Sequence, residues 1–137
     1  MPQYDKPLYI VGIGASAGGL AALQQFFDHM PAESGIAFVV IQHLSADFKS
    51  QLDDLLSRHT SMPIQKVADN STMQPNNIYP NISLTQMEVK DGNLLLTQIS
   101  KDQHVKQPID VFFTSLSKEV GARAVGVVLS GTGKDGT

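Results

Sequence analysis

Three short runs of consecutive apolar residues divide the chain, and each has the composition of a buried strand. They cover residues 8–13, 36–41 and 124–129, and are rich in Ile and Val. Continuous apolar runs of this length are typical of parallel strands that are covered on both faces. We therefore expect three central strands of one mainly parallel sheet.

Apolar residues at helical spacing predict three helices between these strands. The first follows Gly18 and Gly19 and ends before Pro31, whose ring clashes with the preceding turn. Ser45 or Asp47 is placed to cap the second. The third begins at Pro108 and stops at Gly121. Their apolar faces are formed by Leu20, Leu23, Phe26, Phe27 and Met30; by Phe48, Leu52, Leu55 and Leu56; and by Phe112, Phe113, Leu116 and Val120.

The middle of the chain predicts a β-hairpin. Asp91-Gly92 separates the segments 84–90 and 93–99, and Asp-Gly between such segments is a strong hairpin signal. Ile78 and Tyr79 form a further short strand. The order of elements predicts an α/β fold with a mainly parallel, doubly wound sheet and an antiparallel hairpin insertion. Because no repeat, linker or low-complexity stretch interrupts it, we expect residues 1–137 to belong to one domain.

The amino-acid composition excludes several classes of protein. The chain has 137 residues, of which 42% are hydrophobic, enough to bury a core, and its formal charge is −3. This balance argues against a disordered tail and against electrostatic binding of nucleic acid. The sequence has no cysteine, which excludes disulfides, thiolate metal sites and cysteine nucleophiles within it. No apolar stretch reaches the roughly 18 residues of a membrane span.

The first residues also resemble a short signal peptide. Lys6 precedes the apolar run, and residues 15–17 (ASA) mimic a cleavage site. However, Asp5 offsets the charge of Lys6 and Gly12 interrupts the run. We interpret the run as a buried strand instead.

Candidate chemistry lies after the three strands. In open parallel sheets, ligands bind beyond the carboxyl ends of the strands. There the chain has Ser16 in the segment 14–19, His43 in 42–44 and Asp135 in 130–136. A hydroxyl, an imidazole and a carboxylate are the parts of a nucleophile–base–orienter triad. The sequence therefore predicts that these three side chains meet at one edge of the sheet.

Other interpretations of these segments stay open. Residues 14–18 fit G-x-S-x-G, but also a glycine-rich turn with an incidental serine. Gly12, Gly14 and Ala17 fit a variant of the dinucleotide fingerprint, which expects an acidic residue after the second strand, where Gln42 and His43 stand. No P-loop motif occurs, and no residue spacing implies a metal site.

The histidines and Asp135 can also have purely structural roles. His43 can be a structural histidine, and Asp135 a turn residue. His29 and His59 fall in the last turns of predicted helices, where a cation interacts favourably with the helix dipole. His104 lies in a polar stretch and is expected to be solvated.

Residues 13–19 (IGASAGG), 39–44 (VVIQHL) and 127–136 (VVLSGTGKDG) resemble, in order, the three signature segments of CheB-type protein-glutamate methylesterases. Residues 78–80 (IYP) extend the similarity. The resemblance implies a Rossmann-like methylesterase fold, with Ser16 as the nucleophile, His43 as the general base and acid, and Asp135 as the orienting carboxylate. It implies no cofactor. The order Ser, His, Asp also differs from that of α/β-hydrolases.

The resemblance further implies a substrate and partners. Members of the family act in the cytoplasm, where they hydrolyse glutamate γ-methyl esters on the helices of chemoreceptors, and some deamidate glutamines. A chain that starts with this domain is similar to hybrids that also carry CheR-like methyltransferase and sensor domains. No nucleic acid or membrane insertion is implied. Ala17 and Thr132 depart from the usual Thr and Met of the family.

Family domains continue beyond the position of Thr137. The resemblance therefore predicts a domain that is incomplete at its C-terminus. Because chain ends fray unless they are held, we expect a poorly held Asp135 and weak esterase activity. Non-catalytic binding by the same fold is the alternative.

Overall fold

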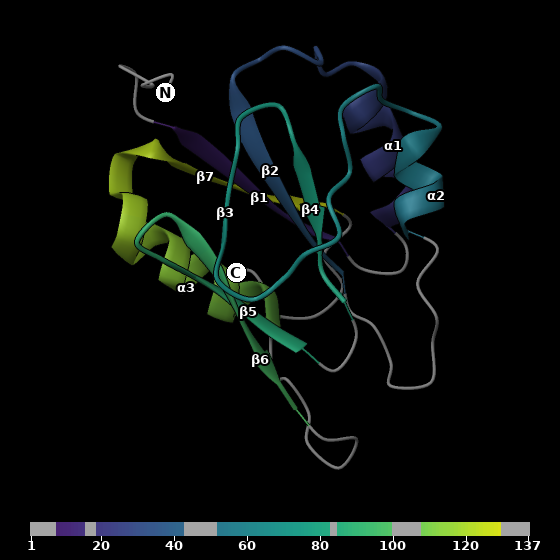
Figure 1. The fold of residues 1–137 in the computed structure, drawn as a ribbon. Coiled ribbons are helices and arrows are strands. Elements are labelled where there is room, and N and C mark those ends of the chain that lie inside the picture. Colours follow the sequence, from purple (N-terminus) through teal and green to yellow (C-terminus); the bar gives the residue numbers. More distant parts are fainter. Residues whose placement is uncertain (1–7, 16–18, 43–51, 83–84, 100–107, 130–137) are drawn as a thin grey trace.

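A computed structural model describes residues 8–15, 19–42, 52–82, 85–99 and 108–129. Its centre is a four-stranded sheet with the strand order β4-β2-β1-β7, in which every neighbouring pair is parallel (Figure 1). The strands are β1 (Tyr9–Ala15), β2 (Ile36–Gln42), β4 (Ile78–Pro80) and β7 (Ala124–Leu129). The three apolar runs and the short strand at Ile78 are thus confirmed as strands of one parallel sheet.

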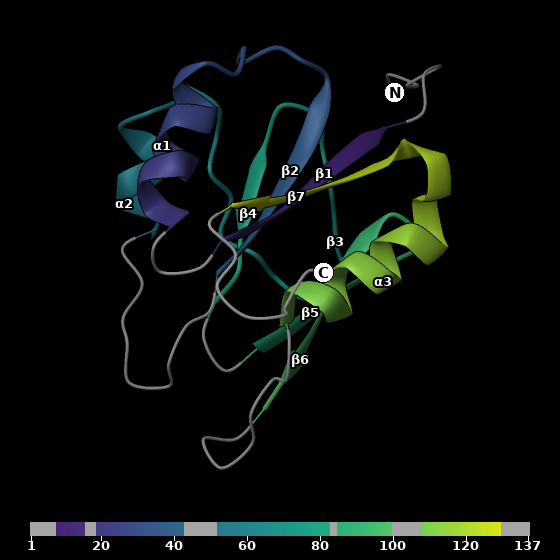
Figure 2. The ribbon, with the colours of Figure 1, turned by 180° about the vertical axis from the view of Figure 1, so that it is seen from behind.

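Helices cover one face of this sheet. They are α1 (Leu20–Asp28) and α2 (Leu52–Ser57), which lie together on that side in both views (Figures 1 and 2). Phe27 of α1 packs edge-to-face on Phe38 of β2, with ring centroids 5.5 Å apart. The buried core on this side consists of Val11, Ile13, Leu23, Phe27, Phe38, Val40, Leu56, Met62 and Ile78.

The other face is covered by α3 (Pro108–Val120) and by a second, smaller sheet. That sheet is antiparallel, with the order β3-β6-β5, and consists of β3 (Ser71–Thr72), β5 (Thr85–Lys90) and β6 (Asn93–Gln98). The core on this side is built by Ile10, Ala37, Val39, Ile41, Val67, Met73, Tyr79, Met87, Val89, Leu94, Ile109, Phe112 and Leu116.

The strand β2 shows why its sequence is apolar without alternation. Phe38 and Val40 point into the core under α1, whereas Val39 and Ile41 point into the core under α3. All four side chains are at most 2% exposed. A strand with cores on both faces has no solvent side, which explains why residues 36–41 are all apolar.

The hairpin prediction is confirmed, with one addition. Asp91 and Gly92 have φ angles of 53° and 80°, the pair of left-handed residues that a type I′ turn requires. The turn joins β5 to β6 as predicted. The addition is β3, whose two residues pair with Asn93 and Leu94 of β6. So short a strand has no period that a sequence pattern could reveal.

Helix boundaries also agree with the predictions where they are described. Helix α3 begins at Pro108, and Gly121 follows it with a φ of 53° and opens a 3-10 turn (Gly121–Arg123) that leads into β7. Helix α1 ends at Asp28, slightly before Pro31. The expected start of the second helix, with its caps Ser45 and Asp47, lies outside the described residues.

Candidate functional site at the carboxyl ends of the strands

The carboxyl ends of three strands lie side by side. In the central strand β1, Ala15 pairs with Gln42 of β2 on one side and with Leu129 of β7 on the other. Each of the three residues is the last of its strand. Since neighbouring strands are about 4.8 Å apart, the chain leaves the sheet at three adjacent points. These are the points from which the predicted catalytic segments start.

The predicted catalytic residues themselves lie outside the described residues. Ser16 directly follows Ala15, His43 directly follows Gln42, and Asp135 comes six positions after Leu129. Their mutual geometry therefore remains a prediction. The same holds for Ala17, Thr132 and His104, which also lie outside the described part of the chain.

The residues on either side of the segment that contains Ser16 lie close together: Gly19 is next to Ala15 and Leu129. A Cβ atom on Gly19 would lie 2.8 Å from the carbonyl oxygen of Leu129 and 3.4 Å from the Cβ of Ala15. Only a glycine fits this close against main-chain atoms. Helix α1 starts at the next residue, and its N-cap residue is Gly19, which has no side chain to bond the first N–H groups. The start of α1 is therefore next to the ends of β1 and β7, where its N–H donors favour negative charge.

Two glycines of the dinucleotide fingerprint have a different role. Gly12 and Gly14 lie inside β1, paired with Val39 and Ile41, and not in the turn after the strand. A Cβ at Gly12 would come 3.0 Å from the ring of Phe112, so the missing side chain makes room for α3. A fingerprint glycine must instead form the tight turn below a pyrophosphate. This placement argues against the dinucleotide interpretation.

A buried asparagine at this edge was missed by the sequence analysis. Asn81 directly follows β4 and is 8% exposed. Its side-chain Nδ2 donates to the carbonyl oxygen of Gln42 (2.8 Å), and its Oδ1 accepts from the N–H of Gln42 (3.0 Å). The available signal was a polar residue directly after a buried strand, the same signal that identified His43.

Both described histidines have structural roles. Nδ1 of His29 lies 2.8 Å from the carbonyl oxygen of Gln25, at the C-terminal end of α1. Nδ1 of His59 lies 2.7 Å from a carboxylate oxygen of Asp28, which links the end of α2 to the end of α1. The sequence placed both histidines in the last turns of helices, which is wrong: α1 ends at Asp28 and α2 at Ser57, so the two residues follow the helices and contact their ends.

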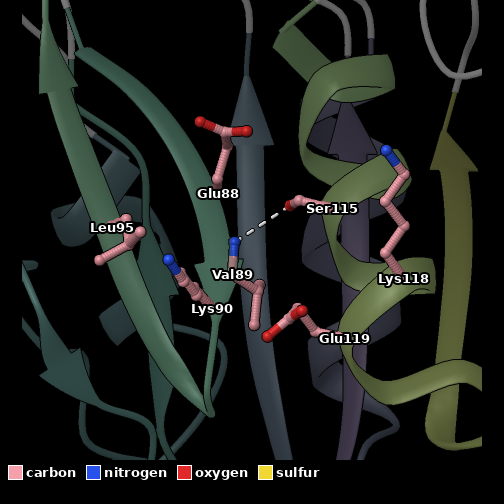
Figure 3. Close-up of a pocket in the computed structure, with 7 residues that line it drawn as sticks. All are labelled: Glu88, Val89, Lys90, Leu95, Ser115, Lys118 and Glu119. Carbon is pink, nitrogen blue, oxygen red and sulfur yellow. Dashed lines mark hydrogen bonds between the residues drawn. The ribbon is translucent and has the colours of Figure 1, made fainter.

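A surface hollow of about 220 Å³ lies between the hairpin and α3, away from the strand ends (Figure 3). The hydroxyl of Ser115 on α3 accepts the N–H of Val89 at 3.0 Å, and a carboxylate oxygen of Glu119 accepts the N–H of Asp91 at 2.6 Å. These polar groups attach the hairpin to the helix. The hollow is thus a packing seam, and Ala15, Gln42 and Leu129 are not among its lining residues.

Within the described residues, no group of three or more His, Asp or Glu side chains is arranged to hold a metal ion. The same part of the chain contains no helix that is long and apolar enough to cross a membrane.

Comparison with known proteins decides the family. The model of the CheB methylesterase family matches residues 11–137, nearly the whole chain. The chain belongs to the CheB methylesterase family. All three strand ends, and the segments that follow them, lie within the matched range.

Curated relatives agree with membership in the CheB methylesterase family. A protein-glutamate methylesterase/protein-glutamine glutaminase 2 of Xanthomonas oryzae is 37% identical over 131 residues, which cover 93% of this chain and 36% of the relative. A protein-glutamate methylesterase/protein-glutamine glutaminase of Mesorhizobium japonicum is 34% identical, over 95% of this chain and 39% of the relative. The chain thus spans little more than a third of the length of these CheB relatives.

A solved structure has the same CheB fold. The methylesterase catalytic domain of Thermotoga maritima CheB superposes with a TM-score of 0.79 at 23% identity, over 96% of this chain and 72% of that domain. The predicted α/β fold, with its parallel sheet and hairpin insertion, is confirmed as that of a CheB catalytic domain.

Proposed function

We propose that this chain is a serine esterase that hydrolyses γ-methyl esters of protein glutamate, with Ser16, His43 and Asp135 as its catalytic residues. One observation carries the proposal: Ala15 pairs with both Gln42 and Leu129, so the three segments with these residues start from adjacent strand ends. Family membership and the names of the relatives support the same reaction.

The reaction needs a proton carrier and an oxyanion site. His43 takes the proton of the Ser16 hydroxyl, and the serine oxygen attacks the ester carbonyl. The tetrahedral intermediate collapses to an acyl-enzyme as its bond to the methoxy oxygen breaks, and His43 donates the proton to that oxygen, which leaves as methanol. Water then attacks the acyl group, again with His43 as base, and releases the glutamate side chain. Asp135 orients the imidazole throughout.

Main-chain N–H groups stabilise the oxyanion in this proposal. The candidates are those near Ala17, close to the start of α1, and those of residues 131–133. Each such donor typically contributes about 10²–10³ in rate. Glutamine side chains pass through the same kind of intermediate, so the site also accommodates deamidation with release of ammonia. Ala17 offers no hydroxyl for a further contact.

The proposed substrate is a methylated chemoreceptor, recognised on its helices in the cytoplasm. CheR-like methyltransferase and sensor domains of the same polypeptide are the proposed partners. Residues 1–137 belong to one esterase domain in this proposal.

Methanol release from methylated receptor tests the proposal. We expect weak release by the wild-type protein and no release above background by Ser16→Ala and His43→Ala. Asp135→Asn should lose less, since Asp135 is expected to be poorly held. A fluorophosphonate probe should label the wild-type protein and spare Ser16→Ala.

Two matched variants control for the substitutions themselves. Ser71→Ala removes a buried hydroxyl that has no hydrogen-bond partner among the described residues, in β3 of the other sheet. His29→Ala removes the imidazole at the end of α1. Both should retain wild-type activity. Undiminished methanol release by Ser16→Ala would overturn the proposal, and a thermal shift with NAD in a protein that releases no methanol would support the dinucleotide alternative instead.

A further inference from the structure

On its β4 side, the end of β2 is held by a side chain, whereas on its other side Gln42 pairs with Ala15 of β1. Strand β4 pairs with β2 only as far as Pro80, opposite Val40. The N–H of the next residue, Asn81, donates to the carbonyl oxygen of Val40 at 2.9 Å, which continues the ladder by one bond. Beyond this bond, the two main-chain groups of Gln42 on that side both pair with the side chain of Asn81.

The Asn81 amide replaces two main-chain groups of a continuing strand. In a regular parallel ladder, the N–H of Gln42 would donate to the carbonyl of residue 81, and its carbonyl would accept from the N–H of residue 83. Here Oδ1 of Asn81 takes the first role at 3.0 Å and Nδ2 the second at 2.8 Å. Both residues are buried, Gln42 at 6% and Asn81 at 8% exposure, so water is a poor substitute for either bond.

The second of these bonds reaches the residue after Gln42. The carbonyl oxygen of Gln42 belongs to the planar peptide unit that also contains the nitrogen and Cα of His43. A donor that fixes this oxygen therefore fixes the plane in which the backbone of His43 begins. Placement of a catalytic base matters to the rate, because a displacement of about 1 Å can cost on the order of 10²-fold.

We propose that Asn81 is a positioning residue for His43, acting through the peptide unit between Gln42 and His43. The inference rests on the proposed function, since it assigns His43 the role of general base. Asn81 itself does not touch the substrate in this proposal. Its effect is therefore expected in kcat rather than in KM.

Asn81→Asp tests the hydrogen bond from Nδ2 of Asn81 to the carbonyl oxygen of Gln42. The ionised carboxylate has the shape of the amide and still accepts the N–H of Gln42, but it cannot donate to the carbonyl oxygen of Gln42, which it repels instead. We expect kcat for methanol release, per folded molecule, to fall about 10- to 100-fold with KM within twofold of wild type. Asn81→Ala, which removes both bonds, should lose at least as much.

Asn77→Asp is the matched control at the opposite end of β4. Its Nδ2 donates to the carbonyl oxygen of Pro75 at 2.8 Å and its Oδ1 accepts from Gln65 at 2.7 Å, so the substitution removes one donor bond and keeps one acceptor bond in the same way. We expect its kcat to stay within twofold of wild type. The folded fraction of every variant is measured by urea unfolding.

The results separate the two proposals. Wild-type kcat in Asn81→Asp, or an equal loss in Asn77→Asp, would overturn the positioning role while leaving the esterase proposal intact, provided that His43→Ala is inactive. An active His43→Ala would overturn both. A loss confined to the Asn81 variants and to kcat supports the inference.

Discussion

Gly14 of β1 lies directly against Ile109 of α3. A Cβ atom at position 14 would be 2.6 Å from Cγ2 and 2.7 Å from Cδ1 of the isoleucine, closer than carbon atoms can approach. Gly14 belongs to the G-x-S-x-G pattern around Ser16, yet its contact is with a helix. The glycine is thus needed for packing just before the candidate nucleophile.

Gly14→Ala should therefore destabilise the fold. We expect a loss of about 1–3 kcal/mol in the free energy of unfolding, because the added methyl group overpacks the core. Ile109→Ala removes the clashing atoms, so the double variant should be more stable than the sum of the two single losses predicts. Urea unfolding of the four proteins measures this coupling, and additive losses would contradict the contact.

The seam between the hairpin and α3 depends on Ser115. Its hydroxyl accepts the N–H of Val89 and donates to the carbonyl oxygen of Phe112 at 2.9 Å. Ser115→Ala leaves a partly buried N–H without its acceptor, which should cost about 1–3 kcal/mol. Ser57→Ala is the control, since the hydroxyl of Ser57 is exposed and donates to the carbonyl of Asp54 within the same helix. Equal unfolding free energies for the two variants would contradict a stabilising role of the hydrogen bond between Ser115 and Val89.

The turn at Gly92 offers a test of backbone strain alone. Apart from its two chain neighbours, no described residue has an atom within 4 Å of a Cβ at this position, but its φ is +80°. Gly92→Ala should lose about 1–2 kcal/mol, because an L-residue is strained in the left-handed region. Gly92→Asn should lose less, since asparagine adopts this region more readily. Thermal and urea unfolding compare the two, and an alanine variant as stable as wild type would refute the prediction.

Tyr79 makes stability depend on pH at the alkaline end. Burial raises the pKa of Tyr79 above its ordinary value of 10.0, an effect that the hydrogen bond from the N–H of Gln74 partly opposes. The unfolded chain releases this proton first, so the contribution is complete below pH 10 and is lost as the pH rises through the folded-state pKa.

Tyr79→Phe should therefore flatten the decline of the unfolding free energy above pH 10. Its stability at neutral pH should be lower, because the N–H of Gln74 loses its acceptor. Urea unfolding at a series of pH values from 8 to 11 measures both effects. Parallel curves for variant and wild type would show that Tyr79 does not titrate differently in the two states.

The local pattern of the sequence was sufficient for most of the fold. Continuous apolar runs predicted β1, β2 and β7, helical spacing predicted α1 and α3, and Asp91-Gly92 predicted the hairpin turn, because each depends on neighbouring residues only. The signature segments around Ser16, His43 and Asp135 indicated the family in the same way, since they are contiguous in the sequence.

The tertiary structure decided what depends on pairing between distant segments. The order β4-β2-β1-β7 brings Ala15, Gln42 and Leu129 together, and no local pattern encodes which strand lies next to which. Position 14 requires a glycine because Ile109 of α3 packs directly on it. The amide of Asn81 is buried because it binds the main chain at the end of β2, 39 positions earlier in the chain. Such contacts form only when separate elements meet, which is why the sequence by itself identified the catalytic candidates but not the residues that support them.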